Sequence, residues 1–497
     1  MPTLLSSPPT MARTLHKPLL PPELQPASST FKFAVKDNIA TLGSPTTCAS
    51  PFLFTYQSPF EATIVRQLRS RGGALVGKTN MDEFGMGSHS LNSVHGPVAN
   101  PNFASVGPPR SAGGSSGGSA VAVRLNEADV ALGTDTGGSI RLPAAYTGTV
   151  GFKPSYGMVS RFGVVPYANS LDTVGLLTRD VRSIYDLVIG SGLIREHDPS
   201  DPTSLTEESR KRCAETHGHN NDPTPLDNHF KSPRSRAAIT IGIPKEYCIK
   251  ELDPLIHAAW KEAESLLKEW GATIAPVSLP TTEVALPAYY VLAPAEASSN
   301  LAKYDGVRYG TRGEASDGAG EVLYSHTRGE GFGDEVKRRI LLGTYSLSSE
   351  KMDNFFIQAQ KVRRLVQRDF DRAFKLPNPL YENDEPFDLS DMDDDVALMD
   401  KKGPAQVDFL LCPTAPTFPP LIGDIQHQTA VDSYMNDVFT VPASLAGLPA
   451  ISIPVPVKGA TPETGPVAGL QLIGQYWDDA RVLAIAHELS QRLPVKI

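Results

Sequence analysis

Two glycine-rich runs of the sequence each carry a serine in a setting that suits nucleophilic chemistry. The first run, residues 113–119, contains the GxSxG pattern centred on Ser115. This pattern is typical of a nucleophile elbow, in which a serine sits on a sharp turn before a helix. A flexible linker has a similar Gly/Ser composition. However, the run leads directly into residues 120–125, whose Ala-Val-Ala-Val-Arg-Leu sequence indicates a helix and argues against a linker.

An elbow serine also requires a histidine held by an acid. The histidines downstream of Ser115 fall mostly in polar loops or exposed-looking helices, and none sits in a strand-end loop that would clearly make it a base. They are His197, His217, His219, His229, His257, His326, His427 and His487. A histidine-based triad is therefore possible but has no support in the sequence.

The second run, residues 133–143, reads Gly-Thr-Asp-Thr-Gly-Gly-Ser-Ile-Arg-Leu-Pro and places Ser139 at the end of a glycine turn. The apolar residues 130–132 before it predict a strand, and a helix is predicted after it. Glycines in such a turn let backbone N–H groups converge on one point, as an oxyanion hole requires. The alternative is a tight strand-to-helix turn in which the serine only caps the helix.

A third run, residues 72–79, matches the P-loop expression GxxxxGK[ST]. A P-loop must follow a strand and open a helix, so that its N–H groups can surround phosphate. Here a helix is predicted before the match, and Ala-Leu-Val in the loop positions favours a buried strand. We therefore predict no nucleotide site at this run.

Short apolar strands alternate with helical segments along most of the chain. Residues 31–36 and 74–78 predict strands on either side of a helix, one face of which is marked by Phe60, Ile64 and Leu68. Further buried strands are predicted at 239–244, 409–412, 451–455 and 470–474, and long helices at 253–270 and 351–374. This alternation is typical of a layered α/β fold. Two polar stretches, near 200–235 and 377–403, are predicted to be solvated, loop-like insertions in a single domain spanning 31–497.

Composition limits the classes of function. The formal net charge of −9 argues against a chain that grips nucleic acid by itself, since phosphate binding needs a basic face. The 4 cysteines lack CxxC pairing, which excludes a disulfide scaffold and disfavours a zinc site. No apolar run is long enough to span a membrane. Residues 1–30 are hydroxyl-rich and acid-poor, which predicts either an organellar targeting segment or a plain disordered tail.

The two serine motifs, together with Ala-Val-Lys-Asp-Asn at 34–38, resemble the amidase signature family in order and spacing. Within that family the chain is similar to A subunits of glutamyl-tRNA(Gln) amidotransferases. The similarity covers about residues 31–495 apart from the two insertions, and the supporting stretches are 77–88, 150–175, 332–348, 434–454 and 469–474. The resemblance implies an α/β amidase-signature fold, with a large mixed sheet covered by helices on both faces.

The resemblance also assigns roles at the reaction centre. It implies Ser139 as the acyl-enzyme nucleophile, Ser115, preceded by a cis peptide bond, as proton relay, and Lys36 as base. A free lysine has a pKa near 10.4, so Lys36 must be desolvated to be neutral at working pH. The N–H groups expected to stabilise the oxyanion are those of Thr136, Gly137, Gly138 and Ser139.

For a glutamine substrate the resemblance assigns Arg339 to the α-carboxylate and Asp437 to the α-ammonium, with Arg338 as the alternative cation. Arginine suits a carboxylate because its fork binds both oxygens. Without the resemblance, the arginines would be expected on a solvated helix face, and Asp437 would be expected to cap a helix.

The implied function is release of ammonia from glutamine for conversion of Glu-tRNA(Gln) to Gln-tRNA(Gln). An amidotransferase B subunit would use ATP and Mg²⁺ and hold most of the tRNA, and a small C-type or equivalent subunit would clasp the chain. No metal or other cofactor is expected on this chain, and the expected location is the mitochondrial matrix. The alternative is a stand-alone amidase for small or fatty amides, which would need neither Arg339 nor Asp437.

The sequence departs from the family pattern at its start. Family members carry several helices before the lysine that matches Lys36, and here that lysine comes early in the chain. We expect either that this helical layer is missing or that the stated start lies inside a longer protein with a genuine presequence.

Overall fold

A computed structural model describes residues 15–16, 30–218, 221, 224–313, 322–381, 406–425, 427–429, 432, 434–462 and 464–495. The predicted tail at 1–30, apart from residues 15–16 and 30, lies outside the described residues. So does most of the predicted insertion at 377–403.

The described strands form one 11-stranded sheet in the order β1-β3-β2-β4-β6-β5-β10-β11-β9-β7-β8. Neighbouring strands are parallel from β3 through β2 to β4 and from β9 through β7 to β8, and antiparallel between β4 and β9. The sheet is therefore mixed, with parallel pairs on both sides of an antiparallel centre. The strands are β1 Leu15–His16, β2 Phe31–Lys36, β3 Gly73–Thr79, β4 Val130–Asp135, β5 Val150–Lys153, β6 Thr173–Thr178, β7 Thr240–Pro244, β8 Thr273–Val277, β9 Phe409–Pro413, β10 Ala450–Pro456 and β11 Val467–Gly474.

The strands predicted from apolar runs are confirmed as β2, β3, β4, β7, β9, β10 and β11. Their burial explains why they were recognisable. Every residue of β4, β9 and β11 is buried, so these segments lack the polar alternation of a half-exposed strand. The predicted layered α/β class is confirmed.

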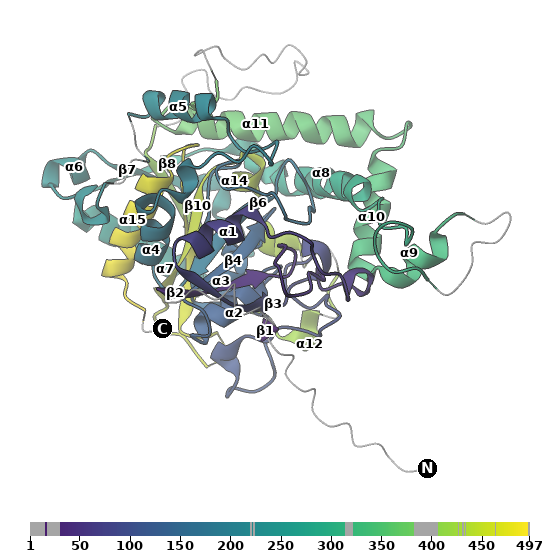
Figure 1. Cartoon of the computed structure of the whole chain (residues 1–497). Coiled ribbons are helices and arrows are strands. Elements are labelled where there is room, and N and C mark those ends of the chain that lie inside the picture. Colours follow the sequence, from purple (N-terminus) through teal and green to yellow (C-terminus); the bar gives the residue numbers. More distant parts are fainter. Residues whose placement is uncertain are drawn as a thin grey trace.

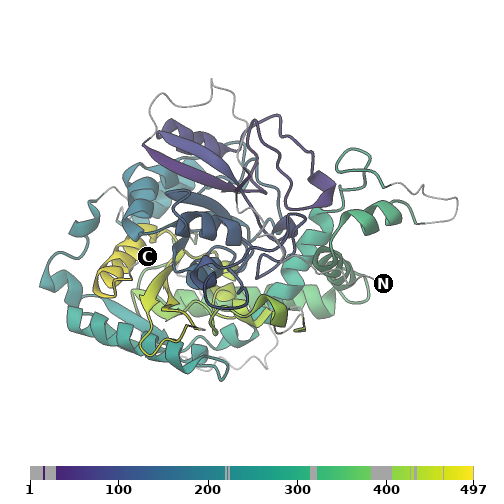
Figure 2. The same ribbon diagram turned by 90° about the horizontal axis from the view of Figure 1, so that it is seen from below.

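Helices cover both faces of this sheet (Figures 1 and 2). Two glycines of β11 point to opposite faces because they are an odd number of residues apart. A Cβ on Gly469 would meet Ala145 of α3, whereas a Cβ on Gly474 would meet Val482 of α15. The helices are α1 Thr63–Ser70, α2 Gly117–Arg124, α3 Arg141–Thr147, α4 Val181–Tyr185, α5 Glu207–Thr216, α6 Pro233–Ala237, α7 Pro254–Trp270, α8 Ala285–Asn300, α9 Ser325–Gly331, α10 Asp334–Ser346, α11 Gln358–Ala373, α12 Ile422–Ile425, α14 Val441–Leu445 and α15 Asp479–Arg492.

The polar stretch near 200–235, predicted to be loop-like, contains the helix α5. Thr206 caps this helix by accepting a hydrogen bond from the N–H of Ser209. Arg210 lies on the buried face of this helix, and its guanidinium donates to the carbonyl oxygens of Met158 at 3.1 Å and Gly157 at 3.3 Å. The stretch is thus held against the core by an arginine that a polar sequence pattern does not reveal.

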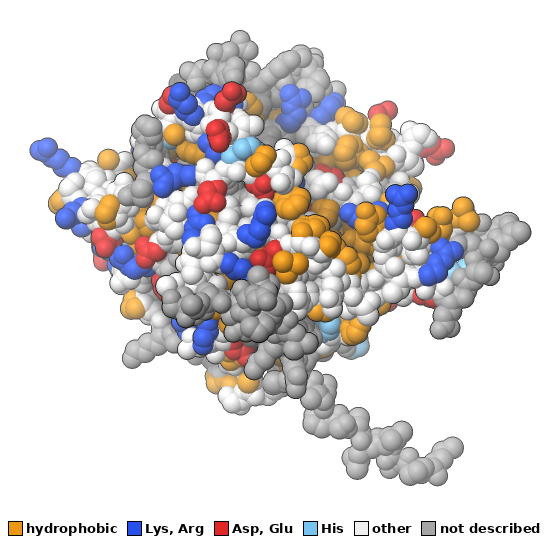
Figure 3. Space-filling view, in the orientation of Figure 1, with side chains coloured by type: hydrophobic (Ala, Val, Ile, Leu, Met, Phe, Trp, Pro, Cys, Tyr) orange, Lys and Arg blue, Asp and Glu red, His pale blue; other side chains and the backbone are white. Residues whose placement is uncertain are grey.

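The surface carries charges of both signs. Figure 3 shows basic and acidic side chains interspersed over the face seen in Figure 1, with apolar side chains between them. Among the helices of the described residues, none combines the length and the apolar character that crossing a membrane requires.

Candidate active site

The topology of the sheet brings Lys36 and the second serine motif to one edge. Strands β2 and β4 are parallel neighbours, with Ala34 opposite Ala131. The carboxyl ends of parallel strands meet at the same edge of a sheet. Lys36 ends β2, and the turn that follows β4 carries Ser139. The order of the strands alone therefore places these two residues near each other.

The same face of the sheet is packed with small side chains. Because side chains alternate along a strand, Lys36 shares its face with Ala34. Ala34 and Ala131 pack against Ala120 and Ala122 of α2 in a cluster made largely of alanines. Small residues let the helix that begins just after Ser115 lie close to the sheet, which brings its first turn within reach of the lysine.

Lys36 is fully buried and its amine is surrounded by hydroxyl groups. Its Nζ lies 2.7 Å from the Oγ of Ser115, 2.8 Å from the Oγ of Ser116 and 3.0 Å from the Oγ1 of Thr134. Burial lowers the pKa of Lys36 to about 7, and nearby carboxylates, first of all that of Asp82, oppose this shift. Near neutral pH a substantial fraction of the amine is therefore uncharged and able to accept a proton.

Ser115 lies at the start of α2, where the peptide bond between Gly114 and Ser115 is cis, as the family resemblance implies. There is no space for a side chain at Gly114. A Cβ there would collide with the Asp82 carboxylate and would lie 2.5 Å from the backbone nitrogen of His89. The glycine of the motif is therefore required by the close approach of the 82–89 segment.

Asp82 is a buried carboxylate that the sequence analysis did not single out. It accepts hydrogen bonds from the N–H groups of Ser90 at 2.7 Å, Leu91 at 2.9 Å and Asn92 at 3.0 Å. Its own N–H donates to the carbonyl oxygen of Ser115 at 3.3 Å. Burial raises its pKa to about 6, against the effect of these donors. Asp82 thus connects the 90–92 loop to the backbone of the first serine motif. No pattern in the sequence predicts this contact.

Ser139 stands at the end of the turn between β4 and α3. Gly138 before it has φ +149, a conformation that favours glycine, and a Cβ there would collide with Thr440. The Ser139 side chain is partly exposed, and none of the described residues hydrogen-bonds to its Oγ. The structure thus brings Lys36 and Ser115 into direct contact and leaves the Ser139 hydroxyl free on the adjoining turn.

Four successive backbone N–H groups of this turn have no acceptor in the described part of the chain: those of Thr136, Gly137, Gly138 and Ser139. Unpaired N–H groups at buried positions are uncommon in folded proteins. Their carbonyl groups, by contrast, are used, since Gly137 accepts from the Thr440 hydroxyl at 2.6 Å and Ser139 accepts from the Ser116 N–H at 3.1 Å. The turn is held through its oxygens, and its donors are left available.

Asp437 lies beside this turn at the end of a 3-10 helix, Met435–Asp437. Its Oδ1 would lie 3.3 Å from a Cβ on Gly138, and its Oδ2 accepts from the hydroxyls of Ser88 at 2.7 Å and Tyr290 at 3.1 Å. Burial raises the pKa of Asp437 to about 6, although these donors favour the charged form. The carboxylate is therefore close to the second serine motif, and the donors that bind its Oδ2 are neutral hydroxyl groups.

Arg339 on α10 is buried among aromatic rings. Its Nη1 donates to the hydroxyl of Tyr167 at 2.8 Å and its Nε donates to Glu335 at 2.7 Å. The guanidinium carbon lies 5.4 Å from the ring centroid of Tyr290 and 5.5 Å from that of Tyr434. Tyr290 therefore touches both predicted substrate-binding residues, because its hydroxyl reaches Asp437 and its ring faces Arg339.

A cavity of ≈ 330 Å³ lies beside this arginine and is lined by Ser88, Glu335, Arg338, Arg339 and Tyr434, among others. Both candidate arginines line it, but they differ in environment. Both arginines pair with Glu335, but Arg338 is exposed whereas Arg339 is buried. A buried cation contributes more to binding than one screened by water. Of the two arginines predicted for the substrate's carboxylate, Arg339 is therefore the one in the less solvated position.

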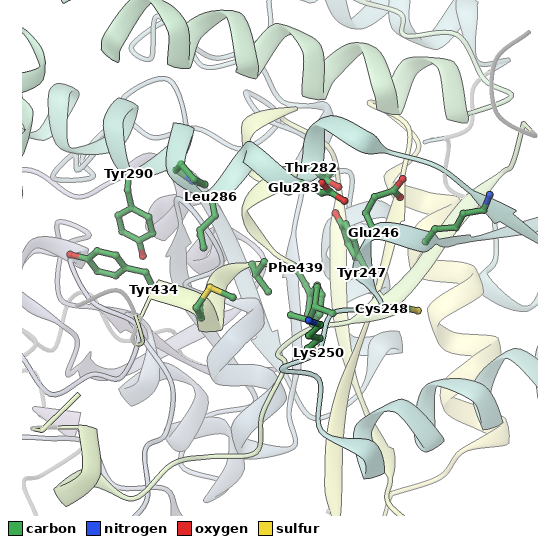
Figure 4. Close-up of a pocket in the computed structure, with 15 residues that line it drawn as sticks. Glu246, Tyr247, Cys248, Lys250, Thr282, Glu283, Leu286, Tyr290, Tyr434 and Phe439 are labelled. Carbon is green, nitrogen blue, oxygen red and sulfur yellow. The ribbon is translucent and has the colours of Figure 1, made fainter. Parts of the chain in front are cut away.

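A larger cavity of ≈ 700 Å³ adjoins this region, and Tyr434 lines both cavities. Figure 4 shows Tyr290 and Tyr434 side by side at one end of it, with Tyr247 and Phe439 farther along. The two tyrosine rings are stacked with centroids 3.8 Å apart. This stacked pair forms part of the wall between Arg339 and the larger cavity, whose lining mixes aromatic, aliphatic and charged side chains.

The other candidate motifs have different structural roles. Residues 73–79 form strand β3, preceded by α1, so the P-loop match is a buried strand as predicted. Two of the downstream histidines make contacts elsewhere, His217 with the carbonyl oxygen of Pro377 and His229 with Tyr185. No group of three or more His, Cys, Asp or Glu suited to a metal ion occurs within the described ranges.

Residues 32–483 match the amidase family, and the chain belongs to that family. The chain is 68% identical over 461 residues to the A subunit of the mitochondrial glutamyl-tRNA(Gln) amidotransferase of Fusarium vanettenii, covering 93% of this chain and 86% of that relative. It is 62% identical over 477 residues to the A subunit of the same mitochondrial enzyme from Pyricularia oryzae, covering 93% and 89%.

Comparison with solved structures gives the same family. The fold is similar to that of the glutamyl-tRNA(Gln) amidotransferase A subunit from Thermotoga maritima, with a TM-score of 0.69 and 33% identity, covering 95% of this chain and 86% of that one. A crystal structure of an amidase is similar with a TM-score of 0.66 and 28% identity, covering 94% and 85%. The resemblance found in the motifs is confirmed at the level of the family and of its A-subunit members.

Proposed function

We propose that the chain is the glutamine-hydrolysing subunit of a tRNA-dependent amidotransferase, releasing ammonia that converts Glu-tRNA(Gln) to Gln-tRNA(Gln). The observation that carries this proposal is the buried Lys36–Ser115 hydrogen bond beside a turn whose N–H groups are free. This is the arrangement that a serine amidase requires, because a serine hydroxyl reacts only when a neighbour takes its proton. The names of the close relatives support the choice of glutamine and tRNA.

In the first half of the reaction the Ser139 oxygen attacks the side-chain carbonyl carbon of glutamine. Ser115 takes the proton of Ser139 and passes its own proton to the neutral Lys36 amine. The carbonyl oxygen becomes an oxyanion, which the N–H groups of the 136–139 turn stabilise. Each such donor typically contributes a few kcal/mol to lowering the barrier.

The tetrahedral intermediate then collapses and the carbon–nitrogen bond breaks. The proton held by Lys36 returns through Ser115 to the leaving nitrogen, so ammonia departs and a glutamyl ester remains on Ser139. Water attacks this ester, with the same pair acting as base, and the Ser139 oxygen takes the proton back. Glutamate and ammonia are the products, and Lys36 and both serines return to their starting states.

Recognition of the substrate's amino-acid end falls to Asp437 and Arg339 in this proposal. Asp437 lies next to Gly138 and would pair with the α-ammonium, and Arg339 would pair with the α-carboxylate. Glu335 and the tyrosines around Arg339 hold its guanidinium in place. An apolar amide would gain nothing from these buried charges, so the alternative of an amidase for fatty amides is disfavoured.

The remaining steps belong to partner subunits. A B subunit would activate Glu-tRNA(Gln) with ATP and Mg²⁺ and bind most of the tRNA, and a small C-type subunit or its equivalent would hold the two together. The net charge of −9 and the mixed surface charges support this division, because tRNA binding needs a basic surface. We place the complex in the mitochondrial matrix, on the support of relatives named as mitochondrial.

The test is glutamine hydrolysis by the co-expressed complex, with and without glutamyl-tRNA(Gln). We expect glutamate release that increases when the charged tRNA is present. Hydrolysis of apolar amides without turnover of glutamine would contradict the proposal and favour the stand-alone amidase.

The role of Ser139 is tested by Ser139→Ala in the same complex. Glutamine-dependent amidation should fall on the order of 10⁶-fold, as for removal of other serine nucleophiles. Amidation with added ammonium chloride should persist, because the partner's chemistry does not involve Ser139. Loss of both activities would indicate a damaged complex rather than a missing nucleophile.

A further inference from the structure

Asp172 is a buried carboxylate that touches two separate parts of the site. One oxygen, Oδ1, accepts a hydrogen bond from the Thr136 hydroxyl at 2.7 Å. The other, Oδ2, accepts from the N–H groups of Tyr167 at 2.8 Å and Ala168 at 3.1 Å. Only 4% of Asp172 is exposed, and hydrogen bonds to a buried charged acceptor are stronger than neutral ones.

The strand pairing explains why Asp172 meets Thr136. Strands β4 and β6 are antiparallel, with Asp135 opposite Thr173. One step beyond this pair, Thr136 leaves β4 where Asp172 enters β6. Thr136 opens the turn that ends on Ser139, so its hydroxyl fixes the first of the four free N–H groups.

The second contact of Asp172 connects it to Arg339, the residue assigned to the substrate's carboxylate. Asp172 binds the backbone of Tyr167, and the hydroxyl of the same tyrosine accepts from Arg339 at 2.8 Å. The Tyr167 ring also lies 5.6 Å from the guanidinium carbon. A displacement of this loop would therefore move the group that holds Arg339.

We propose that Asp172 is a positioning residue that fixes the oxyanion turn and the Arg339 pocket relative to each other. The inference rests on the proposed function, because it takes Arg339 and the turn as the two ends of a glutamine site. Glutamine spans these ends, so its carbonyl reaches the turn correctly only when their separation is fixed. Misplacement of a reacting group by about 1 Å can cost about a hundredfold in rate.

Asp172 is connected to the oxyanion turn through the Thr136 hydroxyl and to Arg339 through Tyr167. These two connections are the two arms of Asp172, and two single substitutions separate them. Thr136→Val removes the hydroxyl on the turn side and keeps the shape of the side chain. Tyr167→Phe removes the acceptor for Arg339 on the substrate side. Asp172→Ala removes both arms, and Asp172→Asn keeps one acceptor oxygen and the volume of the side chain.

Asp198 provides a matched control. It is a buried aspartate of a neighbouring loop that accepts from the Ser160 hydroxyl at 2.5 Å and from the Ser200 N–H at 2.9 Å. It contacts neither Thr136 nor Tyr167. Asp198→Ala removes a comparable carboxylate without touching either arm.

The experiment measures kcat and KM for glutamine in the intact complex. Thr136→Val should lower kcat about tenfold with little change in KM, and Tyr167→Phe should raise KM about tenfold with little change in kcat, each the effect of one hydrogen bond. Asp172→Ala should both lower kcat and raise KM. Asp172→Asn should give kcat and KM values between those of the parent and Asp172→Ala, and Asp198→Ala should keep both within about twofold of the parent.

Double variants test whether Asp172 acts through these two residues. Thr136→Val added to Asp172→Ala should lower kcat no further, and Tyr167→Phe added to Asp172→Ala should raise KM no further. Multiplicative losses, or equal effects of Asp172→Ala and Asp198→Ala, would overturn the proposal. If Asp172→Ala fails to fold, the same cycles with Asp172→Asn decide the question.

A second substrate separates this inference from the proposed function. 4-Aminobutanamide is glutamine without its α-carboxylate, so its turnover should respond to Thr136→Val but not to Tyr167→Phe. Absence of glutamine turnover in the parent complex would refute the proposed function. A parent that hydrolyses glutamine while Asp172→Ala leaves both kcat and KM unchanged would refute only the role of Asp172.

Discussion

The amine of Lys36 lies 2.7 Å from the hydroxyl of Ser115, and the pKa of that amine is lowered to about 7 by burial. The base is active only when it has lost its proton. Hydrolysis of glutamine, measured as kcat/KM, should therefore rise about tenfold per pH unit below pH 7 and level off above it. A rate independent of pH between 5.5 and 8 would contradict the role of Lys36.

Lys36→Arg tests the same base by a different route. Arginine keeps its charge at all accessible pH values and cannot accept a proton. The variant should lose glutaminase activity by at least about a thousandfold at every pH. Partial activity that returns at alkaline pH would indicate that another group is the base.

Burial of Lys36 also affects stability. Its pKa is about 7 in the folded chain and 10.5 in the unfolded chain, so the unfolded state binds more protons between these values. The free energy of unfolding therefore rises with pH across this window and is lowest below pH 7. Lys36→Met should raise the free energy of unfolding near pH 7 by ~1–4 kcal/mol, and this gain should shrink toward pH 10.

Lys153 is the matched control for this prediction. It is also fully buried, with a pKa lowered by burial to about 7, but it contacts none of the serines. Lys153→Met should give a similar gain in thermal stability and keep glutaminase activity, whereas Lys36→Met should be stable and inactive. Destabilisation by both substitutions would show that the amines are needed for packing.

The substrate-binding assignment predicts a change in KM. Arg339→Lys loses the bidentate fork and should raise KM for glutamine about a hundredfold, and Asp437→Asn should act similarly. Arg338→Lys, at an exposed position on the same helix, should stay within about twofold. Equal effects of the two arginine substitutions would remove the distinction between them.

The turn at Gly138 predicts a loss on adding one methyl group. Gly138→Ala introduces a Cβ at φ +149 against Thr440 and should cost ~1–3 kcal/mol of stability and most of the activity. Gly329→Ala on α9 is the control, because a Cβ there meets nothing within 4 Å and alanine favours helix. Equal melting temperatures for the two variants would contradict the steric argument.

The strands and their class were predictable from the sequence because local burial repeats along the chain. Runs such as residues 409–412 and 470–474 are buried on both faces, so they consist almost entirely of apolar side chains. The positions of Lys36 and Ser139 in strand-end segments were predictable for the same reason. The edge of the sheet at which they meet follows from strand order, which local patterns do not contain.

The residues that sequence analysis missed are those whose partners are distant or are backbone groups. Asp82 binds three N–H groups of another loop, and Asp172 binds Thr136 across two strands. Neither contact produces a periodic pattern. The helix at Glu207–Thr216 was missed because it is polar on most positions and is held by Arg210, a residue type expected on a surface.

The alanines that pack α2 against β2 and β4 set a limit on how the chain can change. Any larger side chain at Ala34, Ala120 or Ala131 would push the helix away from the sheet and widen the gap between Lys36 and Ser115. Arg339 and Asp437 lie on separate elements, α10 and the 3-10 helix Met435–Asp437, outside this layer. Substitutions in the later part of the sequence can therefore change substrate preference. Substitutions of the alanines that hold Lys36 near Ser115 would instead disturb proton transfer, so almost none are tolerated.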